Sequence, residues 1–378
     1  MHTKKIALIS PHDEPNYGTM LQAYALAKAI ENLGGRAEYI SYKKVIRQNL
    51  FKKILYYAIR PLKIIDRLKN EKRKSALDDY SFFRTPEFND TMHEFEKFYK
   101  EYIPHSDIVY NPKTIKDSTV YTKFIVGSDQ TWSPNLYTPL SINFLDFVKD
   151  YSKKNAYGPS LGTTNVSESY QKILKEKLSG FANLSCREKT NCSLIEELTG
   201  KKVTHVLDPT LLLTTEQWDK VAQNVVMPEK YVLCYILGEK KCISDFAEML
   251  GKKKNIPVYY IAIRPIYLQK ENSLKGVGPA QIIHLIKNAT YVVTDSFHGS
   301  IFSINYNRNF YCFTKRNNTL EKNDNGRILE VLKDFGLTQR FKADGDMNLE
   351  EDIFFDKISP FLEKCRTESL NYLKKILD

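Results

Sequence analysis

Two patterns of apolar and polar positions alternate along much of the chain. Short runs of apolar and β-branched residues predict buried strands, and longer stretches with apolar residues three and four apart predict helices. Strands are expected at 5–10, 37–42, 122–126, 231–237, 257–263 and 291–294, and helices at 20–33, 244–254, 279–288 and 353–377. Such alternation is typical of parallel sheets with helices on both faces, so the predicted fold class is α/β.

The alternation occurs in two blocks separated by a polar stretch, 214–230, with Pro228 near its end. A chain of 378 residues is long enough for two domains. We therefore predict an N-terminal α/β domain at 1–215, a C-terminal α/β domain at 230–345, and a helical tail at 346–378.

Residues 43–74 differ from the rest because they carry twelve Lys or Arg side chains against only Asp66 and Glu71. Their apolar residues recur at helical spacing, which predicts a basic amphipathic helix. Such a helix can lie on an anionic membrane surface, or it can pack on its own domain with its lysines in solvent. Both interpretations stay open. Nucleic acid is not expected as a partner, since no recognition motif accompanies the charge.

The formal net charge of +11 favours anionic partners. Six cysteines without a C-x-x-C pair predict free thiols, and no motif with metal-ligand spacing is present, so no metal is expected. No apolar run approaches the roughly 18 residues that span a bilayer. The first residues lack the apolar core of a signal peptide, so a cytoplasmic location is expected.

The most informative stretch is 292–300, where an apolar strand ends in a polar cluster containing His298 and an amphipathic run follows. This pattern predicts a strand, a tight turn and a helix start. Free backbone N–H groups and the helix dipole would then surround His298. Because ligands of α/β sheets lie beyond the carboxyl ends of the strands, an anionic ligand beside the imidazole is predicted. The alternative is that His298 only caps or packs the turn.

Two strand ends in the first block carry similar clusters. At 16–19, Gly18 would let the backbone approach a ligand, and Thr19 could cap the helix that follows. The turn has neither the dinucleotide fingerprint nor a P-loop, which disfavours both classes of nucleotide site. At 124–135, Asp129 and Gln130 supply hydrogen-bonding groups and Trp132 an apolar face, a mixture that suits sugars. The alternative is a conventional turn with Trp132 in the core.

Arginine forks suit carboxylate and phosphate groups, although most of the 56 Lys and Arg side chains must be solvated surface. The candidate basic residues are Arg187, Arg264, Lys315, Arg316 and Arg327. Asp208 opens an Asp-Pro-Thr turn, which we interpret as structural.

Taken together, these segments resemble the polysaccharide pyruvyl transferase family from about residue 5 to about 337. The matching motifs are, in order, Asn16-Tyr17-Gly18-Thr19 with Leu21-Gln22-Ala23-Tyr24-Ala25-Leu26, Gly127-Ser128-Asp129-Gln130-x-Trp132, Ser185-x-Arg187-Glu188, Asp208-Pro209-Thr210-Leu211-Leu212, Val277-Gly278-Pro279, Thr294-Asp295-Ser296-Phe297-His298-Gly299-Ser300, and Asn325-Gly326-Arg327-Ile328. No single motif is specific, but their combination in this order is.

The resemblance implies two Rossmann-like domains facing a cleft, the GT-B-type architecture, with a C-terminal helix that crosses back to the first domain. It also implies phosphoenolpyruvate as donor and a sugar diol as acceptor, joined as a cyclic pyruvate ketal with release of phosphate. No cofactor is expected beyond this co-substrate.

By the same resemblance, His298 is the expected general acid and donor contact, Arg187 the donor clamp, and Asp129 the general base for the sugar hydroxyl. The other donor-side residues are Phe297, Gly299, Lys315, Arg316 and Arg327. The other acceptor-side residues are Asn16, Tyr17, Gly18, Gln22, Ser128, Gln130 and Trp132.

The acceptor is expected to be a surface polysaccharide or its lipid-linked precursor at the inner face of the membrane. Two alternatives remain: a glycosyltransferase of the same architecture that uses a nucleotide sugar, and a catalytically silent family member. The pattern indicates neither the acceptor sugar nor the oligomeric state.

Overall fold

The computed structural model describes residues 5–42, 85–111, 114–115, 120–134, 141–314 and 326–378. Its N-terminal half contains a four-stranded parallel sheet of order β2-β1-β3-β4. These strands are β1 (Lys5–Ile9), β2 (Arg36–Tyr39), β3 (Lys123–Val126) and β4 (Lys154–Ala156). The parallel pair β5 (Leu184–Cys186) and β6 (Val203–His205) continues this sheet through a bridge between Asn155 and Asn183.

The C-terminal half contains a six-stranded parallel sheet of order β12-β11-β10-β7-β8-β9. Its strands are β7 (Val232–Tyr235), β8 (Val258–Ile261), β9 (Ser273–Leu274), β10 (Tyr291–Thr294), β11 (Asn309–Phe313) and β12 (Phe341–Lys342). The central strands β7 and β10 are buried along their whole length, as expected of strands covered on both faces.

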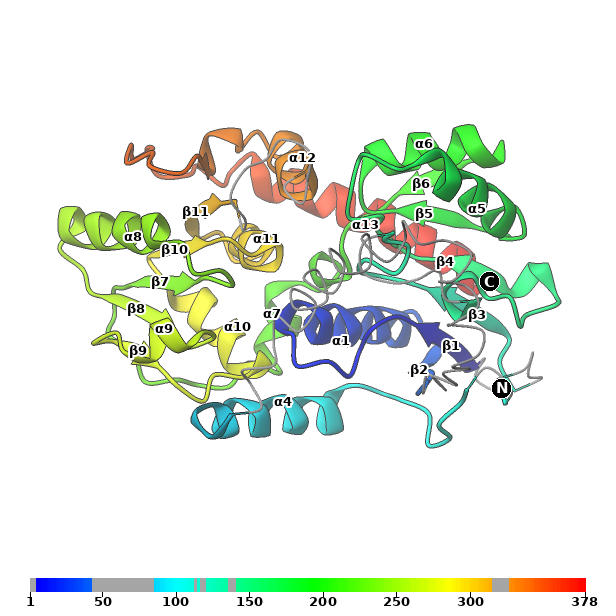
Figure 1. Cartoon of the computed structure of the whole chain (residues 1–378), viewed down its shortest axis with the longest axis horizontal. Coiled ribbons are helices and arrows are strands. Elements are labelled where there is room, and N and C mark those ends of the chain that lie inside the picture. The colour runs from blue at the N-terminus through cyan, green and yellow to red at the C-terminus, as the bar shows by residue number, and fades with distance from the viewer. Residues whose placement is uncertain (1–4, 43–84, 112–113, 116–119, 135–140, 315–325) are drawn as a thin grey trace, which may run out of the picture.

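Helices cover both sheets and separate them (Figure 1). The α-helices are α1 (Tyr17–Asn32), α4 (Asn89–Tyr102), α5 (Glu168–Leu178), α6 (Lys189–Thr199), α7 (Thr215–Asp219), α8 (Lys241–Lys254), α9 (Pro265–Leu268), α10 (Pro279–Asn288), α11 (Phe297–Asn305), α12 (Gly326–Asp334) and α13 (Ile358–Leu377). The 3₁₀ turns are η2 (Pro86–Phe88), η3 (Ser141–Phe144), η4 (Tyr151–Lys153), η5 (Pro209–Leu211) and η6 (Thr338–Arg340).

The two halves share one hydrophobic core around α1, α10, α11 and η5. At its base the Tyr17 hydroxyl donates to the Val277 carbonyl oxygen over 2.6 Å. Nearby, the amide of Gln281 on α10 donates to the Glu94 carboxylate on α4 over 2.7 Å. Helix α4 therefore packs across both halves, although it precedes the predicted boundary at 214–230 by more than a hundred residues.

Helix α13 crosses from the second half back to the first, where it lies beside β4 and β5 (Figure 1). Its Tyr372 hydroxyl donates to the carbonyl oxygen of Ala156 at the end of β4, over 2.9 Å. Its Ser369 hydroxyl accepts from the backbone N–H of Leu207, over 3.0 Å. The predicted α/β class with two Rossmann-like halves, the GT-B-type architecture, is confirmed, and so is the returning C-terminal helix.

Several predicted elements differ from those observed. The helix predicted from 353 begins only at Ile358, and the backbone N–H of Ile353, before it, donates to the Asn309 side chain. The pattern missed β4, β5 and β6, which are three residues long and too short for a periodicity to show. The basic segment 43–74 lies outside the described residues.

Candidate active site

The N-terminus of α1 forms the floor of the site on the first half. Asn16 caps this helix, its side-chain oxygen accepting from the Thr19 backbone N–H over 3.1 Å. Gly18 is in the first turn, and a Cβ there would lie 2.0 Å from Nδ1 of His298. Only glycine allows the two halves to approach this closely.

The turn after β10 holds His298 on the second half. Ser296 caps α11 and accepts from the Gly299 backbone N–H over 3.3 Å. Asp295 accepts from the backbone N–H groups of Leu237 and Gly238 over 2.6 and 2.7 Å, which ties this turn to the one after β7. These contacts fix the backbone from which the His298 side chain extends.

His298 lies between the two halves and exposes 12% of its side chain. Its Nδ1 edge covers Gly18, and its Nε2 lies 3.7 Å from Oδ2 of Asp208. Nε2 is buried without a hydrogen-bond partner. The sequence thus placed His298 correctly at a strand–turn–helix junction, and the structure adds that α1 and Asp208 enclose it.

Arg187 follows β5 and is almost fully buried. Its Nη1 donates to Oδ2 of Asp208, and its Nη2 lies 3.4 Å from Oδ1 of Asp129. Burial alone would lower the pKa of this guanidinium, but the carboxylates of Asp208 and Asp129 outweigh it and raise the pKa. Arg187 was expected to clamp a donor, yet here both Nη atoms face aspartates of the protein itself.

Asp129 joins Arg187 to α1. Its Oδ2 accepts from the Thr19 hydroxyl over 3.3 Å, while Oδ1 faces Arg187. A closed circuit of contacts therefore runs between the two halves, from Gly18 and Thr19 through Asp129, Arg187, Asp208 and His298 back to Gly18. We call this the Arg187 circuit.

Asp208 is the member of the circuit that the sequence interpretation missed. It opens η5, and its Oδ1 accepts from the backbone N–H and hydroxyl of Thr210 over 3.0 and 2.7 Å. Burial alone would raise the pKa of this carboxyl, but the charge of Arg187 holds it well below its usual range. Asp208 follows a strand end as Asp129 and His298 do, but the strand before it, β6, is only three residues long and the sequence pattern did not reveal it.

Phe297 connects the Arg187 circuit with a second arginine. Its ring centroid lies 5.3 Å from Cζ of Arg187 and 5.6 Å from Cζ of Arg327. The side-chain amide of Gln130 is oriented so that its oxygen faces Arg327. That oxygen accepts from Nη1 and Nη2 of Arg327 over 3.1 and 2.7 Å. Arg327 at the start of α12 thereby reaches across to the first half.

Other predicted site residues are in the protein interior instead. Trp132 was expected to offer an aromatic face, but it is fully buried against Phe144 and Phe181, so the core alternative is correct. Gln22 and Ser128 are also buried, and their side chains donate to backbone carbonyls.

Of four more predicted residues, two have structural positions and two lie outside the described residues. Tyr17 makes the basal contact with Val277 described above. A Cβ on Gly299 would lie 2.6 Å from Oγ1 of Thr294, so this glycine allows α11 to pack against β10. Lys315 and Arg316 fall outside the described residues.

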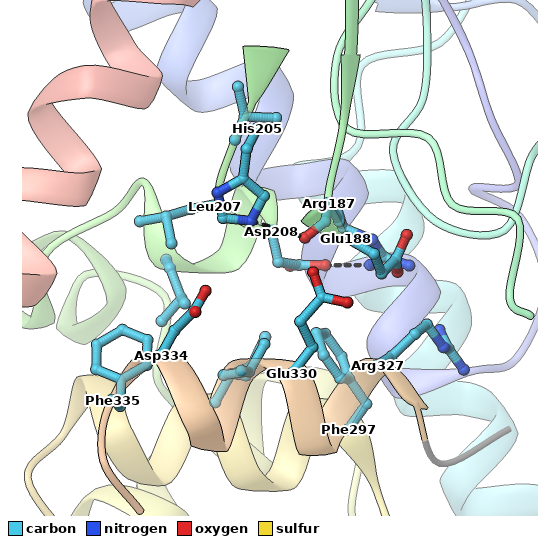
Figure 2. A pocket seen from close by; sticks show the side chains of 14 residues that line it. Arg187, Glu188, His205, Leu207, Asp208, Phe297, Arg327, Glu330, Asp334 and Phe335 are labelled. Carbon is cyan, nitrogen blue, oxygen red and sulfur yellow. Dashed lines mark hydrogen bonds and ion pairs between the residues drawn. The ribbon is translucent and has the colours of Figure 1, made fainter. Parts of the chain in front are cut away.

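A small cavity lies beside Arg187 and Asp208, between the ends of β5 and β6 and helices α11 and α12 (Figure 2). Its volume is about 30 Å³, enough for about two water molecules. Glu330 points into it from α12, towards the dashed Arg187–Asp208 pair (Figure 2).

The rim of this cavity is closed by polar contacts between the halves. Glu330 accepts from the backbone N–H of Lys189 and from the Thr190 hydroxyl, the latter over 3.1 Å. The Lys189 ammonium lies 2.6 Å from the Asp334 carboxylate. These contacts are partly exposed, so separating the halves at this edge costs little.

Across the described ranges, no group of three or more His, Cys, Asp or Glu side chains is placed to hold a metal ion. None of the described helices is both long and apolar enough to cross a membrane.

The fold and site define a GT-B-type α/β protein with a charged, His-containing site between its two halves. The sequence profile of the polysaccharide pyruvyl transferase family matches residues 16–316, and the chain belongs to that family. No curated protein sequence matches the chain.

Two solved structures are similar at low sequence identity. The UDP-GlcNAc 2-epimerase from Methanocaldococcus jannaschii aligns over 96% of this chain and 91% of its own, with 12% identity and a TM-score of 0.49. The spinosyn rhamnosyltransferase SpnG aligns over 99% and 95%, with 8% identity and a TM-score of 0.37.

Proposed function

We propose that this protein transfers the enolpyruvyl group of phosphoenolpyruvate to two hydroxyls of a sugar, forming a pyruvate ketal and releasing phosphate. The observation that carries the proposal is the position of His298, enclosed between both halves after the end of β10 and next to Phe297, whose ring contacts two arginines. Family membership supports transfer to a polysaccharide. The donor and the ketal chemistry are our assignment.

The chemistry requires a proton donor and a site for two anionic groups. One hydroxyl adds to C2 of the donor while its methylene carbon takes up a proton and becomes a methyl group. Phosphate then leaves with the C–O bonding pair, and the second hydroxyl attacks C2 and loses its proton. His298 is the proton donor to the methylene, since an imidazole can change charge near neutral pH.

Arg327 is the arginine that we assign to the donor's phosphate or carboxylate. One of its partners across the site is the neutral amide of Gln130, whereas Arg187 faces two carboxylates. Exchanging an amide for an anion is favourable for a guanidinium, because charged pairs are the stronger hydrogen bonds. Asp129 remains our choice of base for the acceptor hydroxyl.

Donor entry on this proposal requires the halves to separate. The cavity beside Arg187 has room for about two water molecules, and among the described residues the partly exposed contacts of α12 with Lys189 and Thr190 lie at its rim. Opening at that edge would expose Arg327 and Phe297 to the donor. Closure would then return His298 to its place over Gly18 and exclude water from the reacting groups.

Calorimetric titration with phosphoenolpyruvate tests the donor without knowledge of the acceptor. We expect saturable binding to the wild type and 10- to 100-fold weaker binding to His298→Ala, the loss of about one charge-assisted hydrogen bond. His284→Ala, a histidine on the surface of α10, is the matched control and should bind like the wild type. No binding at millimolar donor, together with saturable binding of a nucleotide sugar, would favour the glycosyltransferase alternative.

We also propose that the acceptor is lipid-linked and that residues 43–74 contact an anionic membrane. These residues have a net charge of +10, almost the whole of the +11 carried by the chain. Polybasic segments are attracted to anionic bilayers by about 1 kcal/mol per basic residue near the surface. Sedimentation should therefore recover the protein with vesicles rich in phosphatidylserine and not with neutral vesicles. Equal recovery with both kinds of vesicle would count against membrane contact.

A further inference from the structure

The two ring nitrogens of His298 have different surroundings. Nε2 is buried and faces Oδ2 of Asp208 at 3.7 Å, and no other partner for it is present among the described residues. Nδ1 lies over Gly18 at the start of α1 and, unlike Nε2, is not one of the buried atoms that lack a partner. The exposed fraction of the side chain therefore belongs to the rest of the ring and not to Nε2.

Oδ2 is the oxygen of Asp208 that is placed to accept a hydrogen bond from His298. Its Oδ1 already accepts from the backbone N–H and hydroxyl of Thr210. Its Oδ2 accepts from Arg187, and the remaining capacity of that oxygen faces His298. The Asp208 side chain exposes only 1% of its surface.

We propose that Asp208 is a positioning residue for His298, holding the proton on Nε2 and leaving Nδ1 as the nitrogen that exchanges a proton with the substrate. The residue acts through the imidazole and touches no reacting atom. The exchange of a proton between Nδ1 and the substrate rests on the proposed function. The tautomer of His298 does not, because it is a property of the protein alone.

Arg187 supports the proposed role of Asp208. Its guanidinium neutralises Asp208 and keeps that carboxyl ionised, so that the oxygen facing Nε2 accepts rather than donates. A carboxylate in this position also stabilises the imidazolium that carries the proton to be transferred. Closing the 3.7 Å gap to hydrogen-bonding distance needs only a small rotation of the ring, and such contacts commonly tighten when substrate binds.

Nitrogen-15 NMR of histidine-labelled protein tests the proposal without any ligand. At a pH where the imidazole is neutral, the His298 signals, assigned by their loss in His298→Gln, should report a proton on Nε2. In Asp208→Asn they should report a proton on Nδ1 or an exchange between the two forms. The control is Asp295→Asn, which removes a buried carboxylate three residues away that binds backbone N–H groups instead of the imidazole. That variant should keep the wild-type tautomer.

Two results would overturn the proposal: a wild-type His298 protonated on Nδ1, or an Nε2 proton that Asp208→Asn leaves in place. The wild-type spectrum alone decides the first, so the test survives if the variant fails to fold. If phosphoenolpyruvate does not bind but the tautomer is as expected, the function fails and the role of Asp208 stands.

Turnover provides a second readout once an acceptor is known. Asp208→Asn should lower kcat by about 10²- to 10⁴-fold, as loss of the orienting carboxylate does for other acid–base histidines, with little change in KM for the donor. Equal changes in kcat and KM would contradict a positioning role.

Discussion

The two halves of the molecule supply the site in different ways. Apart from Arg327 on α12, the second half contributes one continuous stretch, Ser296 to His298, in which the first residue caps a helix. The first half contributes Gly18, Asp129, Arg187 and Asp208, which come from four strand ends or helix starts spread over 190 residues. One side of the site is therefore local in sequence, and the other is assembled only by folding.

The two halves also differ in the interactions that stabilise their parts of the site. In the second half, a helix cap worth about 1 kcal/mol and the Asp295 carboxylate, which accepts from two backbone N–H groups, fix the turn. In the first half, the buried guanidinium of Arg187 faces two carboxylates, and although burial would raise the pKa of Asp208, the charge of Arg187 lowers it. The first half should therefore respond far more strongly to loss of a single residue.

The largest expected effect comes from Arg187→Met. It leaves the carboxylates of Asp208 and Asp129 without their counter-ion, and breaking a buried pair in this way costs about 3–5 kcal/mol. Urea unfolding followed by circular dichroism measures the loss. The matched control is Lys287→Met, whose partner Asp219 is half-exposed, and it should change the free energy of unfolding by no more than about 1 kcal/mol.

The loss of stability caused by Arg187→Met should depend on pH. Because the pKa of Asp208 is lowered in the folded protein, its ion pair adds stability above the unfolded pKa of about 3.9, and that stability is lost as the pH falls. The difference between wild type and Arg187→Met should be largest near neutral pH and shrink below about pH 4. A difference that stays constant down to pH 3 would argue against an ionised Asp208.

A smaller effect is expected where the halves touch. Gly18→Ala places a methyl group 2.0 Å from Nδ1 of His298, so the imidazole must move. Overpacking of this kind costs about 1–3 kcal/mol, partly offset by the better helix propensity of alanine. On the proposed function, turnover should also fall, by about 10²-fold, because the proton donor is displaced.

Two variants sharpen this prediction. Gly180→Ala is the control, since its new methyl would meet other atoms only at 3.5 Å and should change stability little. In the double variant Gly18→Ala with His298→Ala the clash is absent, so most of the lost stability should return. Strictly additive effects would mean that the imidazole is not over Gly18.

The sequence predicted the fold class, the strand β10, the helix α10 and the position of His298 with good precision. Those elements have strong local signals: a β-branched run, a proline at the helix start, and a polar cluster at a strand end. It failed for β5 and β6, which are too short for a pattern, and they are the strands that deliver Arg187 and Asp208. The role of Trp132 was left open because an aromatic residue after a strand suits a ligand face and a core equally.

The sequence by itself therefore determined the family, the parallel α/β architecture and the residue types that meet at the strand ends, because these depend on local periodicity and motif order. Only the tertiary structure decided that Arg187 faces Asp129 and Asp208, that Asp208 faces His298, and that Gly18 makes room for the imidazole. Those contacts join residues up to 280 positions apart. Which charge pairs with which is set by the packing of the two halves against each other, and no local pattern encodes it.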